Sequence, residues 1–146
     1  MASCVLFGNR NFTGNIADCL DAVARDLITA HAVDTFYVGH HGNFDRDAIS
    51  YLGRLKRKHP EISYCVVLSR LPCPNWLEGI PTLLPEGIES IPPKYAILYR
   101  NDFMLKRADY VVVHQRYKYG GTARMVERAR RLKKPIIHLT APIDLV

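Results

Sequence analysis

Short apolar runs alternate with segments of helical periodicity along the chain. Five such runs cover residues 4–7, 35–38, 63–69, 110–113 and 136–139. They are continuous rather than alternating, as expected for strands of a parallel sheet that helices cover on both faces. We therefore predict a single Rossmann-like three-layer α/β/α domain over residues 1–146, with a five-stranded parallel sheet in the order 3-2-1-4-5.

The segments between the runs carry helix signals. After Asn15, apolar residues recur at intervals of four, three and four (Ile16, Leu20, Val23 and Leu27). Asn15 is a favourable N-cap for this helix, and Asn43 is the expected cap of a second helix that ends near residues 59–60. Further helices are expected over residues 93–107 and 120–134.

Residues 70–92 interrupt this alternation. The segment holds most of the prolines and the only tryptophan, Trp76. Long loops inside a compact domain are uncommon and often functional. Two interpretations stay open, namely a lid or oligomer contact and a proline-stiffened surface loop.

Charge and composition narrow the partners. The net charge is +6, with 48% hydrophobic residues. The basic excess lies in residues 51–146 and is densest over 116–134, which indicates either a solvated helix face or an anionic partner. No apolar run is long enough to span a bilayer, and the N-terminus does not resemble a secretion signal. We expect a cytoplasmic protein with reduced cysteines and no membrane partner.

The loops that follow the strands are the expected binding region, because open parallel sheets bind ligands where the strand order reverses. These loops cover residues 8–14, 39–43, 70–92 and 114–121. Glycines before a helix N-terminus suit a phosphate group, since they leave N–H groups free. The candidate ligand-binding residues there are Gly8, Asn9, Arg10, Gly39, His40, His41, Asn43, Arg70, Lys118, Gly120, Gly121 and Thr122.

Several familiar motifs are absent. The chain has no GxGxxG after the first strand, no GxxxxGK[ST] and no GxSxG, which disfavours a dinucleotide oxidoreductase, a P-loop NTPase and an esterase. His40 and His41 have only Asp45 nearby as a further metal ligand, and adjacent histidines rarely converge on one ion. We expect no metal site and no resident cofactor.

Arg100 lies in an apolar stretch of the helix expected over residues 93–107. Arg100 and Met104 are four residues apart and share a helix face. A buried arginine needs a partner. Beside a carboxylate such as Glu127, it could hold a ribose or phosphate and polarise a glycosidic bond, or form only a structural ion pair.

In their order, these segments resemble the SLOG superfamily, which joins the Lonely Guy enzymes with the Rossmann domain of DNA-processing protein A. The resemblance rests on residues 7–10, 100–104, 108–109 and 120–122, and covers nearly the whole chain. Residues 37–45 and 92–93 are closest to a branch of small, uncharacterised bacterial and phage members.

Lonely Guy enzymes hydrolyse nucleoside 5′-monophosphates. The resemblance implies catalytic roles for Arg100 and Glu127. This sequence departs from the family's PGGxGTxxE motif at three positions, Tyr119, Ala123 and Arg124. Other SLOG domains are thought to bind nucleotide ligands without turning them over, and the family also implies a homo-oligomer.

Three functions follow. The first is binding of a nucleotide or nucleotide-derived ligand, of the NAD/ADP-ribose or cyclic-nucleotide type, as a sensor or sequestering module. The second is a nucleoside 5′-monophosphate N-glycosidase. The third is single-stranded nucleic-acid binding through the basic helix and tyrosines such as Tyr117 and Tyr119.

Overall fold

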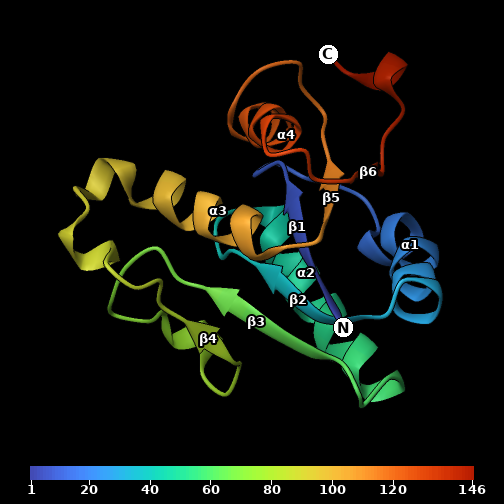
Figure 1. Cartoon of the computed structure of the whole chain (residues 1–146), viewed down its shortest axis with the longest axis horizontal. Helices are drawn as coiled ribbons and strands as arrows, with labels where there is room; N and C mark the ends of the chain where they lie inside the picture. Colours follow the sequence, from blue (N-terminus) through green and yellow to red (C-terminus); the bar gives the residue numbers. More distant parts are fainter.

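A parallel β-sheet forms the middle layer of the computed structural model, which describes residues 1–146 apart from the side chain of Pro142 (Figure 1). Within this part of the chain the sheet has six strands, in the order β4-β3-β2-β1-β5-β6. The strands are β1 (Ala2–Gly8), β2 (Val33–Val38), β3 (Ser63–Val67), β4 (Thr82–Leu83), β5 (Tyr110–His114) and β6 (Ile136–His138).

The predicted α/β architecture and the relative order of five strands are confirmed, but the predicted number of strands is wrong. The additional strand, β4, comes from the 70–92 segment and extends the sheet beside β3, where Val66 pairs with Thr82 and Val67 with Leu83. Two residues are too short to display a strand periodicity. The pairing of β4 is therefore not visible in the hydrophobic pattern.

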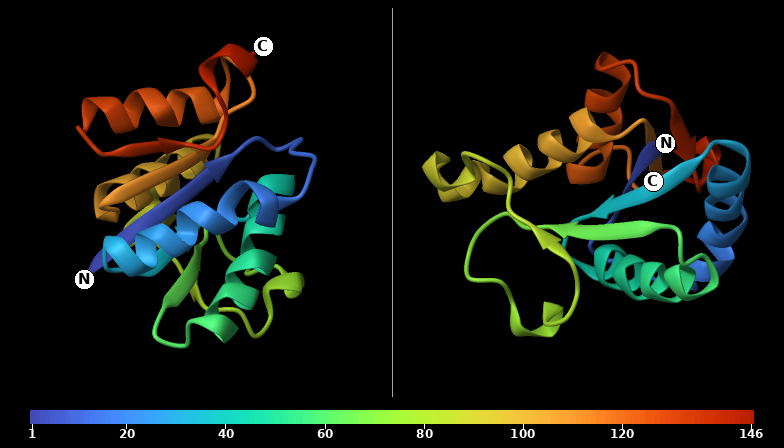
Figure 2. Two further views of the ribbon diagram at one scale, coloured as in Figure 1. Left: turned by 90° about the vertical axis from the view of Figure 1, so that its right-hand side faces the viewer. Right: turned by 60° about the horizontal axis from the view of Figure 1, so that its bottom comes forward.

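Helices cover both faces of the sheet. They are α1 (Ile16–Ala30), α2 (Asn43–Lys58), α3 (Ala96–Arg107) and α4 (Gly121–Arg131). In Figures 1 and 2, α1 and α2 lie on one face, and α3 and α4 lie on the other. None of the described helices is long and apolar enough to cross a membrane.

Strand β1 has a buried side chain on each face in turn, which explains its continuous apolar sequence. Cys4 and Leu6 belong to the core under α1 and α2, whereas Val5 and Phe7 belong to the core under α3 and α4. β1 pairs with β2 on one side and β5 on the other. Its carboxyl end therefore lies at the centre of the sheet edge, where the strand order reverses.

The two asparagines expected to cap helices behave differently. Asn15 caps α1 as predicted, because its Oδ1 accepts hydrogen bonds from the amides of Ala17 at 2.9 Å and Asp18 at 3.3 Å. The prediction for Asn43 is wrong, since Gly42 is the N-cap of α2 and makes no side-chain cap bond. The Asn43 side chain instead donates to the carbonyl of Phe12 at 3.3 Å.

The 70–92 segment is anchored to the domain. Short 3₁₀ turns, η1 (Asn75–Leu77) and η2 (Ile88–Ser90), flank β4. Each turn contributes one buried apolar residue, Leu77 and Ile88 respectively. A third turn, η3 (Pro93–Tyr95), leads into α3, so α3 begins three residues later than the proline that was expected to start it.

Candidate functional site

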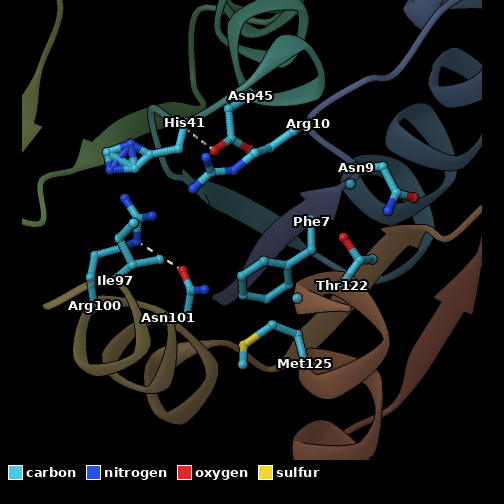
Figure 3. A pocket seen from close by; sticks show the side chains of 12 residues that line it. Phe7, Asn9, Arg10, His41, Asp45, Ile97, Arg100, Asn101, Thr122 and Met125 are labelled. Carbon is cyan, nitrogen blue, oxygen red and sulfur yellow. Dashed lines mark hydrogen bonds between the residues drawn. The ribbon is translucent and has the colours of Figure 1, made fainter. Parts of the chain in front are cut away.

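A cavity of about 270 Å³ lies at the carboxyl end of β1, between the first turns of α2 and α4 and one face of α3 (Figure 3). This is the position at which the strand order reverses and at which open parallel sheets bind ligands. The lining residues are Phe7, Gly8, Asn9, Arg10, His41, Asp45, Ile97, Arg100, Asn101, Gly121, Thr122 and Met125.

Arg100 is the most deeply buried charged group of this cavity, with 2% of its surface exposed. Its Nη1 donates to the carbonyl of Val67 at 2.9 Å, and its Nε donates to Oδ1 of Asn101 at 2.8 Å. These bonds use two of the five N–H donors of a guanidinium. None of the ion pairs found among the described residues includes Arg100. Burial lowers the pKa of Arg100 to about 10, a value at which the group is still charged at neutral pH.

Gly39 leaves the space that the Arg100 guanidinium occupies. A Cβ added at Gly39 would lie 2.8 Å from Cζ and 2.8 Å from Nη1 of Arg100. Gly39 directly follows β2. Real Cβ atoms do not approach other heavy atoms so closely, so a larger residue at this position would displace Arg100. The glycine therefore serves the packing of Arg100 and is not itself part of the cavity wall.

Arg10 brings a second positive charge to the cavity from the loop after β1. Its backbone carbonyl accepts a hydrogen bond from the amide of Asn43 at 2.8 Å, which fixes this loop against the start of α2. Gly42 permits the approach, since it has a φ of +91° and an added Cβ would lie 2.6 Å from Cα of Arg10. In Figure 3 the Arg10 side chain extends into the space between Asp45 and His41.

Asp45 supplies a buried carboxyl group from the first turn of α2. Its Oδ2 accepts a hydrogen bond from the amide of His41 at 3.0 Å. Burial raises the pKa of Asp45 to about 6, against the opposing effects of that bond and of the charges on Arg100 and Arg10. The group is therefore close to its titration point in the physiological range, as is common at functional sites.

His40 and His41 lie side by side, with ring centroids 4.2 Å apart. The amide of Ser69 donates to Nε2 of His40 at 3.3 Å, and Nε2 of His41 lies 3.2 Å from the Ser69 hydroxyl. Burial, and next the charge on Arg100, lower the pKa of each ring to about 4. Both rings are therefore neutral at pH 7.

The N-terminus of α4 faces the cavity through Gly121 and Thr122. The N-cap is Gly120, which has a φ of +98° and makes no side-chain cap bond. The first amides of α4 are therefore free of a capping side chain, and the positive end of the helix dipole favours an anion there.

Part of the cavity wall is apolar. Phe7, Ile97 and Met125 line it from β1, α3 and α4. In Figure 3, Phe7 and Met125 lie next to each other. The site thus combines an apolar wall with cations and free N–H donors, which is the usual composition of a small-molecule pocket.

The structure brings together about half of the sequence-predicted site residues. Those that line the cavity are Gly8, Asn9, Arg10, His41, Arg100, Gly121 and Thr122. Others support it or lie nearby: Gly39 packs on Arg100, Asn43 holds the β1 loop, Gly120 caps α4, and His40 and Arg70 line an adjacent cavity. Lys118 is exposed, and its amide donates to the carbonyl of Val146 at 2.9 Å.

Glu127 lies outside this cavity. It lines a separate groove between α3 and α4 and forms ion pairs with Arg131 at 3.5 Å and Arg130 at 3.9 Å. The buried stripe of α4 contains Thr122, Met125, Val126 and Ala129. Glu127 comes two positions after Met125, and two positions correspond to opposite sides of a helix. The helical periodicity of the sequence therefore already argued against a place for Glu127 in the cavity.

Sequence reasoning did not select two polar residues that line the cavity, Asp45 and Asn101. Asp45 was considered only as a metal ligand. Asp45 could have been recognised as a cavity residue from its position, because it lies in the first turn of a helix that follows the end of a strand. Asn101 follows Arg100 directly, and its side chain holds the Nε of that arginine.

In comparisons with known proteins, no family model matches the sequence, and no curated protein matches it significantly.

Proposed function

We propose that the chain binds a nucleotide or nucleotide-derived ligand in the cavity at the end of β1, as a sensor or sequestering module of the NAD/ADP-ribose or cyclic-nucleotide type. The observation that carries the proposal is Arg100, a buried guanidinium that lines the cavity and pairs with no carboxylate among the described residues. A charge buried in this way is stabilised when an anion supplies the missing partner.

The surroundings of Arg100 support a phosphate as that anion. Arg10 adds a second guanidinium, and the uncapped start of α4 adds backbone N–H donors. The apolar wall made by Phe7, Ile97 and Met125 suits the flat faces of a sugar or a base. At about 270 Å³ the cavity is slightly smaller than most ligand pockets, which usually measure about 300–1,000 Å³. That size suits one phosphorylated unit.

The test is calorimetric titration of the purified protein with AMP, cyclic AMP and ADP-ribose. Arg10→Ala is the informative variant, because Arg10 is exposed and its removal leaves the core intact. Losing one charge-assisted hydrogen-bonding group costs about 1.5–3 kcal/mol, so affinity falls by roughly 10- to 150-fold. Arg57→Ala, an exposed arginine at the other end of α2, is the matched control and leaves affinity unchanged. Absence of binding by all three nucleotides refutes the proposal.

A second candidate function is hydrolysis of the N-glycosidic bond of a nucleoside 5′-monophosphate, and Asp45 favours it. Asp45 is the only carboxylate among the described residues that line the cavity, and its pKa of about 6 suits proton transfer at neutral pH. With Glu127 outside, Asp45 takes the catalytic role in this reading. Chromatography of AMP incubated with the protein decides the matter: release of adenine that Asp45→Asn abolishes supports hydrolysis, and intact AMP excludes AMP hydrolysis.

A further inference from the structure

A second cavity, of about 440 Å³, adjoins the first and shares His41 with it. It is formed by the start of the 70–92 segment and includes Arg70, Leu71 and Trp76 together with His40. Because one histidine ring lines both cavities, a ligand that leaves the first cavity past His41 enters the second.

Trp76 is held in place although it is exposed. The residue that follows it in η1, Leu77, is 1% exposed and anchors the turn, whereas Trp76 itself is 42% exposed. The guanidinium of Arg46 lies 5.1 Å from the centroid of the Trp76 ring. An indole that is both fixed and solvent-accessible is a ready platform on which a planar ring stacks.

The first turn of α2 connects the two cavities. Asp45 lines the first cavity, and the next residue, Arg46, lies against Trp76. Two adjacent residues of one helix turn, Asp45 and Arg46, therefore fix how far the first cavity lies from Trp76.

Positive charge is concentrated between the cavities. The pKa of His41 is lowered by burial and then by Arg100, the neighbouring His40, Arg10 and Arg70, so all three guanidinium groups lie within electrostatic range of this one ring. Arg10 and Arg100 belong to the first cavity and Arg70 to the second. This arrangement suits a group with more than one negative charge at the junction.

We infer that the cavity beside Trp76 is a second ring subsite, and that the ligand is a dinucleotide-type diphosphate whose two ring-bearing halves occupy the two cavities. The diphosphate lies at His41 among the three arginines, and the second ring stacks on Trp76. This inference rests on the proposed function of the first cavity, and it narrows the ligand class from nucleotides in general to those with two halves.

Trp76 also provides the assay, because it is the only tryptophan of the chain. NAD⁺, which has two rings joined through a diphosphate, is titrated against the protein in parallel with AMP, which represents one half. We expect NAD⁺ to change the tryptophan emission and to bind at least about tenfold more tightly than AMP. Trp76→Ala, followed by calorimetry, should weaken NAD⁺ binding roughly 5- to 150-fold and leave AMP binding unchanged, because only the second half of NAD⁺ reaches the indole.

Tyr95→Ala is the matched control. Tyr95 is 49% exposed, has a cation 5.1 Å from its ring centroid, and lines neither cavity. Its removal should change neither affinity. Arg70→Ala provides a second variant at an exposed position, and it should weaken NAD⁺ while sparing AMP.

The outcomes separate the two proposals. If AMP binds but NAD⁺ binds no more tightly, or if Trp76→Ala leaves NAD⁺ affinity intact, the second subsite is refuted and the first cavity stands. If Trp76→Ala weakens AMP as well as NAD⁺, the single base of AMP already stacks on Trp76 and the two-cavity arrangement is wrong. If a short single-stranded oligonucleotide binds more tightly than NAD⁺ and depends on Trp76, the ligand is nucleic acid. If neither AMP nor NAD⁺ binds, the second subsite is refuted, and titration with cyclic AMP and ADP-ribose then decides whether the first cavity binds a nucleotide at all.

Discussion

Replacement of Asp45 by asparagine should make the fold more stable at neutral pH. Asp45 is 9% exposed, and its pKa is raised from the ordinary value of 3.8 to about 6. Because the folded chain holds this proton more tightly than the unfolded chain, ionisation of Asp45 destabilises the fold above pH 6. At about 1.4 kcal/mol per pKa unit, the penalty is about 3 kcal/mol.

Asparagine preserves the shape of the side chain and can still accept the hydrogen bond from the His41 amide. Asp45→Asn should therefore gain up to about 3 kcal/mol in urea unfolding at about pH 7.5. As the pH falls from 6 towards 3.8, the native carboxylate becomes protonated and the penalty disappears. The advantage of the variant should thus shrink to about 1.5 kcal/mol near pH 5 and approach zero below pH 4.

The exposed acid Asp26, replaced in the same way, should change stability by less than about 0.5 kcal/mol. The free energy of unfolding is measured for wild type and variant at each pH, and the difference between them is compared. Titration of His40 and His41 contributes equally to both proteins and cancels in this difference, because burial and nearby positive charges lower the pKa values of these rings. The reasoning fails if Asp45→Asn is less stable than wild type at pH 7.5. That result would mean that attraction between Asp45 and Arg100 outweighs the cost of burying the carboxylate.

Three further outcomes follow from the same structure. Gly39→Ala should displace the Arg100 guanidinium, since the new Cβ would lie 2.8 Å from its Cζ. The affinity for AMP should then fall at least about tenfold, and an unchanged affinity in calorimetry would show that Arg100 does not contact the ligand. Asn15→Ala should destabilise the fold by about 1 kcal/mol in urea, because two capping bonds are lost, and a change below about 0.3 kcal/mol would argue against the cap. The pKa values of His40 and His41 are lowered to about 4, so between pH 6.5 and 4 these two side chains take up protons only in the unfolded chain, and the free energy of unfolding should decline as the pH falls. Replacement of both histidines by glutamine should flatten that decline, and identical pH profiles of unfolding for wild type and variant would contradict the lowered pKa values.

The five longer strands were predictable because each has a continuous apolar run and ends near glycine or polar residues, and their order was predictable from the doubly wound architecture that such runs indicate. β1 illustrates why, since Val5 and Leu6 are buried under opposite helix layers and neither face needs polar residues. β4 was not predictable, because Thr82 and Leu83 become a strand only through pairing with β3. Such pairing depends on the path of the chain rather than on local composition.

The binding region was also predictable in outline, because strand ends and glycines mark it in the sequence. Individual roles were not. Asp45 is buried within electrostatic range of Arg10 and Arg100, which are distant from it in the sequence, so its environment exists only in the folded chain. Glu127 was selected through the family resemblance, although the buried stripe of α4 places it on the other side of that helix.

The bond between Arg100 and the Val67 carbonyl joins α3 to the end of β3 through a side chain that also lines the cavity. Opening of the first half of α3 would therefore take apart the anion site. A bound anion opposes such opening by about 2.7 kcal/mol when its concentration is a hundred times its dissociation constant. Amide hydrogen exchange through local opening of α3 should then slow about a hundredfold, while local opening of α1 on the opposite face is unaffected. The exchange rate of α3 amides is thus a direct kinetic measure of how much of the site is occupied.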